Sequence, residues 1–94
     1  MGSCIIVKRR GHKEKFDEKK VYGSVYAACA SAHCDEENCE KVAGELTKKI
    51  KKIIKGKKIV KSIMIRRVIE TELKKRDKEL FFFYEQHLPN LRRL

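Results

Sequence analysis

The sequence predicts an α+β domain in which a small three-stranded antiparallel β-sheet, made of a hairpin and one later strand, caps a four-helix bundle. Three observations lead to this fold class. The chain opens with β-branched residues before a glycine turn, four later stretches repeat apolar residues at helical spacing, and a second short β-branched run separates the middle two of them. Its 94 residues suit one domain, so residues 1–94 are expected to fold as a single unit.

The hairpin is predicted at the start of the chain. Ile5, Ile6 and Val7 favour a strand over residues 4–9, because β-branched side chains pack well on a pleated sheet. Gly11 lies in a tight turn, where the missing Cβ permits a positive φ. Residues 14–16 then return as the second strand.

The first two helices are predicted from their caps and their apolar faces. Asp17 and Asp35 are good N-caps, and Gly56 can end the second helix. Gly23 lies inside the first helix, where we expect close packing to explain a residue that disfavours helix. The expected inward residues are Val21, Val25, Ala28, Cys29 and Ala32, followed in the second helix by Cys39, Val42, Ala43, Leu46, Ile50 and Ile53.

A third strand and two more helices complete the expected fold. Residues 57–61 are short and β-branched at their centre. Ser62 is predicted to cap the third helix and Asp77 the fourth, and Pro89 should kink or end the last helix because proline lacks an amide donor. The expected inward residues are Ile65, Val68, Ile69 and Leu73, followed in the last helix by Leu80, Phe81, Tyr84, His87 and Leu88.

The charge and the absence of apolar segments limit the class of protein. A net charge of +11 on this length predicts an anionic partner. The stretch from Lys48 to Arg67 holds eight lysines, two arginines and no acid, and it fits either a solvated face or a weak nucleic-acid or acidic-protein contact. No run approaches the ~20 apolar residues needed to cross a bilayer, and no signal peptide is visible, so we expect a cytoplasmic protein without a membrane contact.

The cysteines and the missing motifs argue against metal or catalytic chemistry. Cys4, Cys29, Cys34 and Cys39 are expected to be free thiols. His33 beside Cys34 invites a zinc reading, but no Cys-x-x-Cys pair occurs, so no metal site is predicted. The chain contains no phosphate-binding loop and no nucleophile motif, which predicts a protein that is not an enzyme.

The basic hairpin is the strongest candidate site. Lys8 and Arg9 lie beside the turn and Lys20 begins the following helix, so three cations converge where phosphate oxygens would fit. Glu14 is an acceptor suited to an adenine amino group. Taken alone, these charges fit a solvated hairpin equally well.

The order of these motifs resembles the ATP-cone, the regulatory nucleotide-binding domain of ribonucleotide reductases and some transcriptional repressors. Such domains open with an apolar strand, Lys-Arg-x-Gly, an acidic residue, an apolar residue, then Asp or Asn and Lys-Ile. The matching segment here runs from Ile5 to Val21, although Arg10 stands where an aspartate is usual. Later parts of the pattern are matched by Ala27, Ala28, Ser62, Ile65 and Tyr84.

The resemblance implies an adenine-nucleotide site. The cations of the hairpin and Ser62 would face phosphates or ribose, Glu14 and Asp17 would lie on the adenine side, and Arg66 would contact the ribose. Arg92 is a further candidate for a late phosphate contact. The residues placed at the ligand by the resemblance are Val7, Lys8, Arg9, Glu14, Phe16, Asp17, Lys20, Val21, Ser62 and Arg66.

The sequence thus predicts a free-standing, non-catalytic ATP-cone that binds ATP or dATP as an allosteric effector. It would act on a separate partner chain or through self-association. The alternative is a small basic nucleic-acid-binding protein, with Lys48 to Arg67 as its contact surface.

Overall fold

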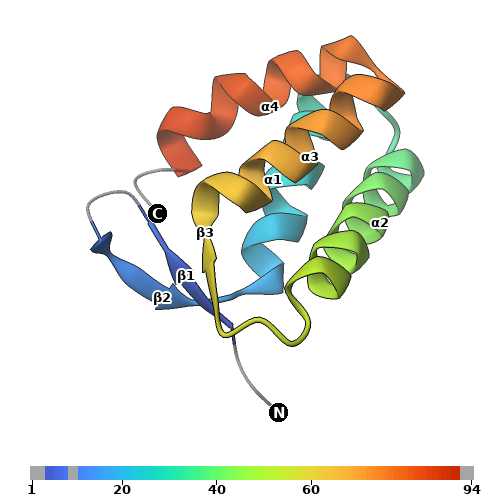
Figure 1. Ribbon diagram of the computed structural model, residues 1–94. Coiled ribbons are helices and arrows are strands. Elements are labelled where there is room, and N and C mark those ends of the chain that lie inside the picture. The colour runs from blue at the N-terminus through green and yellow to red at the C-terminus, as the bar shows by residue number, and fades with distance from the viewer. Residues whose placement is uncertain (1–3, 9–10, 92–94) are drawn as a thin grey trace.

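The computed structural model describes residues 4–8 and 11–91, with side chains as far as residue 86. Along this part of the chain the predicted order of strands and helices is confirmed. Figure 1 shows the sheet at one end of the helices. The elements are β1 (Ile5–Val7), β2 (Lys13–Lys15), α1 (Glu18–Ser31), α2 (Glu36–Ile54), β3 (Ile59–Lys61), α3 (Ser62–Arg76) and α4 (Lys78–Leu91).

The sheet is mixed, which corrects the expected antiparallel arrangement. The strand order is β2-β1-β3, and β1 pairs antiparallel with β2 but parallel with β3. A three-residue strand shows the same alternation in either direction, so its direction is not readable from sequence. The direction is set by α1 and α2, which return the chain to the beginning of β1. There the amide of Ile5 donates to the carbonyl of Lys58 at 2.8 Å.

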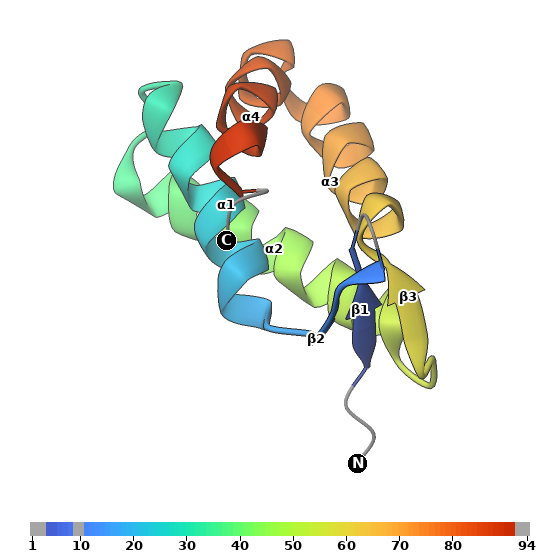
Figure 2. The same cartoon turned by 90° about the vertical axis from the view of Figure 1, so that its left-hand side faces the viewer.

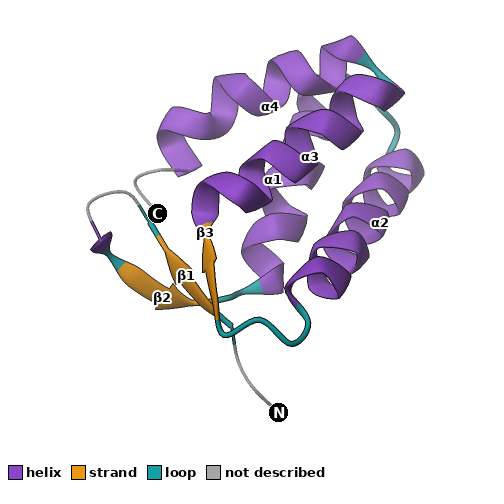
Figure 3. Ribbon diagram, viewed as in Figure 1, coloured by secondary structure: helices purple, strands orange, loops and turns teal. Residues whose placement is uncertain are grey.

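The junction between β3 and α3 corrects two further expectations. Ser62 is the first residue of α3, and the N-cap is Lys61, whose side chain makes no capping hydrogen bond. Because Lys61 is also the last residue of β3, strand and helix join without a linker (Figures 2 and 3). The sheet is therefore continuous with α3 and does not form a separate cap on a closed bundle.

The three predicted aspartate caps are confirmed. Asp17 accepts from the amide of Lys19, Asp35 from that of Asn38, and Asp77 from that of Glu79, each at 2.9 Å. These carboxylates satisfy amides that have no partner within the helix. Helix α4 continues past residue 89 to Leu91, so its proline does not end it.

The turn between α1 and α2 is a Schellman motif. The amide of Cys34 donates to the carbonyl of Cys29, and the amide of His33 to that of Ala30, both at 3.1 Å. His33 occupies the left-handed position, with φ 63°. Glycine usually takes this position because it has no Cβ to clash.

The same turn explains the spacing of the last three cysteines. Cys29 and Cys34 hold the two positions that touch in a Schellman motif. Cys34 also precedes the cap Asp35, and Cys39 lies four residues beyond that cap, the pair of positions that pack as a hydrophobic staple. Both four-residue gaps thus follow from two consecutive helix ends. In the described ranges no group of His, Cys, Asp or Glu side chains is arranged to hold a metal.

One core joins the sheet to the helices. Gly23 corrects an expectation, because it is exposed and a Cβ there would meet no atom within 4 Å. Several residues expected inside are only half-buried, namely Ala32, Val42, Ile53, Val68 and Phe81, and the side chains of His87 and Leu88 lie outside the described part. The buried apolar residues are Cys4, Ile6, Val21, Val25, Ala28, Cys29, Cys39, Ala43, Leu46, Ile50, Ile54, Val60, Ile65, Ile69, Leu73, Leu80 and Tyr84.

Candidate functional site

Two lysines from different elements meet one carboxylate at the hairpin. The Nζ of Lys8 lies 3.2 Å from Glu14 Oε1, and the Nζ of Lys20 lies 3.4 Å from Glu14 Oε2. Glu14 stands opposite Ile6 in the sheet, so its side chain is on the face that packs against the helices. This face brings the carboxylate to the first turn of α1, which carries Lys20. We call Lys8, Glu14 and Lys20 the hairpin cluster.

The parallel pairing of β1 and β3 places Ser62 near this cluster. Val7 lies opposite Lys61 in the register. Strands that run parallel end at the same edge of a sheet, so the next residues, Lys8 and Ser62, leave that edge together. Ser62 is half-buried at the first position of α3. Ser62 is therefore not the N-cap of α3, and in the described part of the chain no hydrogen bond of its hydroxyl is seen.

A second polar group lies where α1, α3 and α4 meet. The Nε of Arg66 lies 3.6 Å from Glu70 Oε1. Tyr84 of α4 is 3% exposed, and its burial, together with the charge of Glu70, raises the pKa of its hydroxyl. Arg66 and a hydrogen bond with Ser24 partly oppose that rise.

This second group connects to the hairpin cluster through α1. Ser24 follows Lys20 by four residues, so both side chains lie on one face of the helix. The polar side chains therefore continue from Glu14 through Lys20 and Ser24 to the α3–α4 contact. Sequence reasoning did not place Ser24, Glu70 or Tyr84 at the site. The four-residue spacings from Lys20 and Arg66 are the signal that could have found the first two.

The other predicted site residues have different surroundings. Val7 faces away from Glu14, because alternate residues of a strand point to opposite faces. Phe16 is half-buried against the core, and Val21 belongs to it. Asp17 uses Oδ1 as the cap of α1. Arg9 and Arg92 lie outside the described residues.

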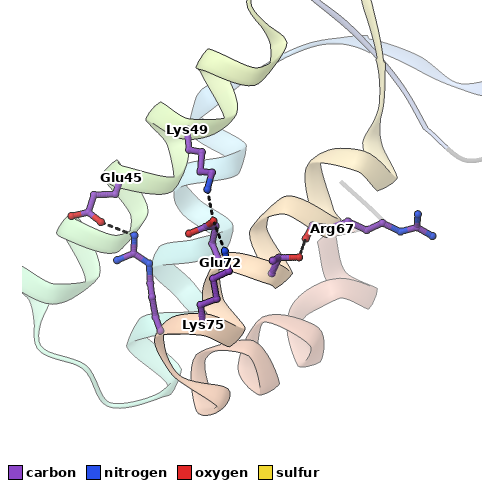
Figure 4. A network of polar contacts seen from close by, with 7 residues as sticks. Glu45, Lys49, Arg67, Glu72 and Lys75 are labelled. Carbon is purple, nitrogen blue, oxygen red and sulfur yellow. Dashed lines mark hydrogen bonds and ion pairs between the residues drawn. The ribbon is translucent and has the colours of Figure 1, made fainter.

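The basic stretch from Lys48 to Arg67 is divided by ion pairs. Lys49 pairs with Glu72 across α2 and α3, and Lys51 lies 2.7 Å from Glu18 of α1. Figure 4 shows the Lys49–Glu72 pair beside Glu45, while Arg67 points away from it. With Arg66 held by Glu70, three of the ten cations thus serve contacts between or within helices.

The remaining seven cations come from α2, the loop after it, β3 and α3, and we call them together the basic surface. Each is exposed, and none has an ion pair with another residue in the described part of the chain. Three of them follow one another along α2 at spacings of four and three residues, so they share a helix face. The seven cations of this basic surface are Lys48, Lys52, Lys55, Lys57, Lys58, Lys61 and Arg67.

Comparison with known proteins agrees with the order of these features. A family model described as the ATP cone domain matches residues 4–84. A comparison with curated proteins gave no match, and no described helix is long and apolar enough to cross a bilayer. ATP cone domains are regulatory domains that bind adenine nucleotides. The matched residues include both strands of the hairpin, its lysine and acid cluster, and the buried tyrosine of α4, and the chain therefore belongs to the ATP cone domain family.

Proposed function

We propose that this chain binds ATP or dATP as an effector at the hairpin cluster and the start of α3, without turning it over, and so regulates a separate partner chain. The observation that carries the proposal is the meeting of Lys8 and Lys20 on Glu14, with Ser62 at the same edge of the sheet. Two mobile ammonium groups at the sheet edge from which Ser62 also emerges suit a triphosphate. The proposed ligand residues are Val7, Lys8, Arg9, Glu14, Phe16, Asp17, Lys20, Val21, Ser62 and Arg66.

In this proposal binding exchanges one ion pair for another. Without nucleotide, Glu14 holds both lysines. All three side chains keep substantial exposure, so these pairs are weak and can be broken at low cost. A triphosphate offers more charge than one carboxylate and draws the lysines toward it. Glu14 is then released to accept a hydrogen bond from the adenine amino group.

Calorimetric titration with ATP, dATP, ADP and GTP tests the site. We expect micromolar affinity for ATP, roughly −7 to −8 kcal/mol. Replacing Lys8 and Arg9 together by alanine should weaken binding by about 2–4 kcal/mol, because charge-assisted hydrogen bonds are lost. The matched control replaces Lys52 and Lys55, which lie on the basic surface, and should bind ATP as before. Equal affinity in the Lys8/Arg9 variant and the parent would contradict the site.

Two substitutions of Glu14 separate its roles. Glu14→Gln removes the competing charge but keeps a carbonyl acceptor, so ATP should bind at least as tightly as to the parent protein. Glu14→Ala removes the acceptor as well, and the preference for ATP over GTP should fall. If both variants keep that preference, Glu14 does not contact the base.

Absence of turnover is tested by phosphate release. The sequence contains no phosphate-binding loop and no nucleophile motif, and we expect release equal to the buffer blank. Release that disappears in the Lys8/Arg9 variant would reveal an ATPase. Sedimentation with and without ATP then examines regulation by self-association, and a change of mass on adding ATP would support that mode over a separate partner.

A second candidate function is weak, sequence-independent binding of nucleic acid. The observation that favours it is the basic surface, whose seven exposed cations lack ion pairs within the described residues. If about five phosphates are engaged, the log–log salt slope of duplex DNA binding should be near −4.5. Changing Lys48, Lys52 and Lys55 to glutamine should flatten the slope by about 2.7, at about 0.9 per lost contact.

The ion-paired lysines supply the control for this test. Lys49 and Lys51 lie on the same helix but are held by Glu72 and Glu18. Their replacement by glutamine should change the salt slope less than replacement of two unpaired lysines. No DNA binding at low salt would leave the basic surface as a solvated face.

A further inference from the structure

Three thiols lie together at the turn between α1 and α2, away from the nucleotide site. The amide of Cys34 bonds the carbonyl of Cys29 at 3.1 Å, and the Sγ of Cys39 donates to the carbonyl of Cys34 at 3.7 Å. All are free cysteines. Lys20 lies near the opposite end of α1, so chemistry at these thiols is separate from the hairpin cluster.

The three thiols differ in access to solvent. Cys29 is 0% exposed and Cys39 is 1% exposed, whereas Cys34 is half-buried. Burial raises the pKa of Cys29 to about 12, and it raises the pKa of Cys39 as well. Both buried groups therefore react poorly with a reagent from solution near neutral pH, and each can react only with a disulfide formed directly beside it. Cys34 is the thiol that a small reagent meets first.

The geometry of the turn selects one partner for Cys34. A Schellman motif brings together the side chains at the two positions held by Cys29 and Cys34. Cys34 and Cys39 are both among the neighbours that raise the pKa of Cys29, in agreement with a cluster of three adjacent thiols. A disulfide needs Cα atoms within about 7 Å, and two residues already joined by the backbone bond of a Schellman turn meet that need with little movement.

We propose that Cys34 is a thiol–disulfide exchange site for low-molecular-weight disulfides and that Cys29 completes the reaction by forming a Cys29–Cys34 bond. The Cys34 thiolate attacks one sulfur of the small disulfide and expels one thiolate, which takes up the proton that Cys34 released. Cys29, after losing its own proton, attacks the sulfur of Cys34 and expels the second small thiol. One small disulfide is reduced to two thiols while two protein thiols are oxidised to one disulfide. The bond ties the end of α1 to the residue before the α2 cap.

Oxidised glutathione is a suitable probe. The positions of the aspartates allow the bonded cysteines to be identified by peptide mapping. Cleavage before each aspartate yields peptides 1–16, 17–34, 35–76 and 77–94. Cys29 and Cys34 fall together in 17–34, Cys39 falls in 35–76, and Cys4 falls in 1–16 as an internal control. After oxidation, alkylation and digestion, we expect 17–34 to lack two hydrogens and carry no alkyl group. The peptides with Cys39 and Cys4 should be alkylated.

Other maps overturn the proposal. A cross-link between 17–34 and 35–76 would show that Cys39 is the partner. Two alkylated thiols in 17–34, or a glutathione adduct that persists there, would show that no internal bond forms. These outcomes concern the native chain alone, so the result does not depend on a variant that folds poorly.

Two matched variants identify the completing thiol. Cys29→Ala should stop the reaction at a mixed disulfide on Cys34, whereas Cys39→Ala, an equally buried change, should still close the Cys29–Cys34 bond. Equal behaviour of the two variants with native circular dichroism would overturn the assignment. ATP titration of the oxidised protein is a separate measurement, so failure of this proposal is distinguishable from failure of the nucleotide site.

Discussion

Val7 and Lys61 stand opposite each other in a parallel pair of strands, and this register brings Lys8 and Ser62 out of the sheet at one edge. One position comes from the first hairpin and the other opens α3, more than fifty residues later. An antiparallel β3 would have sent Ser62 to the opposite end of the sheet. The parallel direction of β3 is therefore what allows the start of α3 to join the hairpin and α1 at the proposed phosphate site.

Ser62→Ala tests this relationship. Ser62 is the first residue of α3 and not its N-cap, so the substitution should leave the melting temperature nearly unchanged. Loss of one hydrogen bond to a charged ligand should weaken ATP binding by about 1–2 kcal/mol, measured by calorimetry. Ser24→Ala is the contrasting variant. The buried hydroxyl of Ser24 donates to the carbonyl of Val21, so its removal should reduce stability. Unchanged ATP affinity in Ser62→Ala would remove Ser62 from the site.

His33→Gly should stabilise the domain. His33 holds a left-handed conformation with φ 63°, which costs a residue with a Cβ about 1–2 kcal/mol. Glycine avoids most of that cost, but its unfolded chain has more conformational freedom to lose on folding. We therefore expect a net gain of about 1 kcal/mol in the free energy of unfolding, measured by urea titration. Ala32→Gly is the control. Ala32 has φ −81°, which an L-residue adopts without strain, so this variant should lose stability. A loss in both variants would contradict the strain at His33.

Gly23→Ala should also stabilise the domain, through helix propensity. A Cβ at Gly23 meets no atom within 4 Å, so alanine should add up to about 1 kcal/mol in thermal or urea unfolding. The same substitution at Gly56 is the control with the opposite sign. Gly56 has φ 82°, and alanine there should cost about 1 kcal/mol or more. Destabilisation by Gly23→Ala would contradict the open space found at this position.

The Lys49–Glu72 pair should make stability depend on pH in the acid range. The hydrogen bond and charge of Lys49 lower the pKa of Glu72 below its usual value. A carboxylate with a lowered pKa stabilises the fold above the unfolded pKa, and this contribution disappears as the pH falls through the lowered value. The difference in unfolding free energy between the parent and Glu72→Gln should be steady from pH 7 to about 5 and shrink below about 4.

The size of this effect is limited by exposure. The side chains are 46% and 15% exposed for Lys49 and Glu72, so we expect at most about 1 kcal/mol at pH 7. Glu85→Gln provides the control, since Glu85 is exposed and has no ion pair within the described side chains. Equal pH profiles for both variants would show that the Lys49–Glu72 pair adds nothing.

Local features of the sequence were sufficient to predict the helices and strands of this protein and the family to which it belongs. Asp17, Asp35 and Asp77 cap helices because a short carboxylate bonds the nearby free amides wherever the chain is placed. Gly11 and Gly56 adopt positive φ for an equally local reason. The motif from Ile5 to Val21 likewise carries the family resemblance without reference to distant contacts.

Only the tertiary structure decided how distant side chains combine. The parallel direction of β3, the release of Ser62 from capping, and the pairing of Lys49 and Lys51 with acids of other helices all depend on packing between segments far apart in sequence. The three cysteines show the same division. Their spacing is visible in the sequence, but the structure was needed to explain it. Cys34 belongs both to the turn that ends α1 and to the start of α2, and such a turn depends on the directions of both helices.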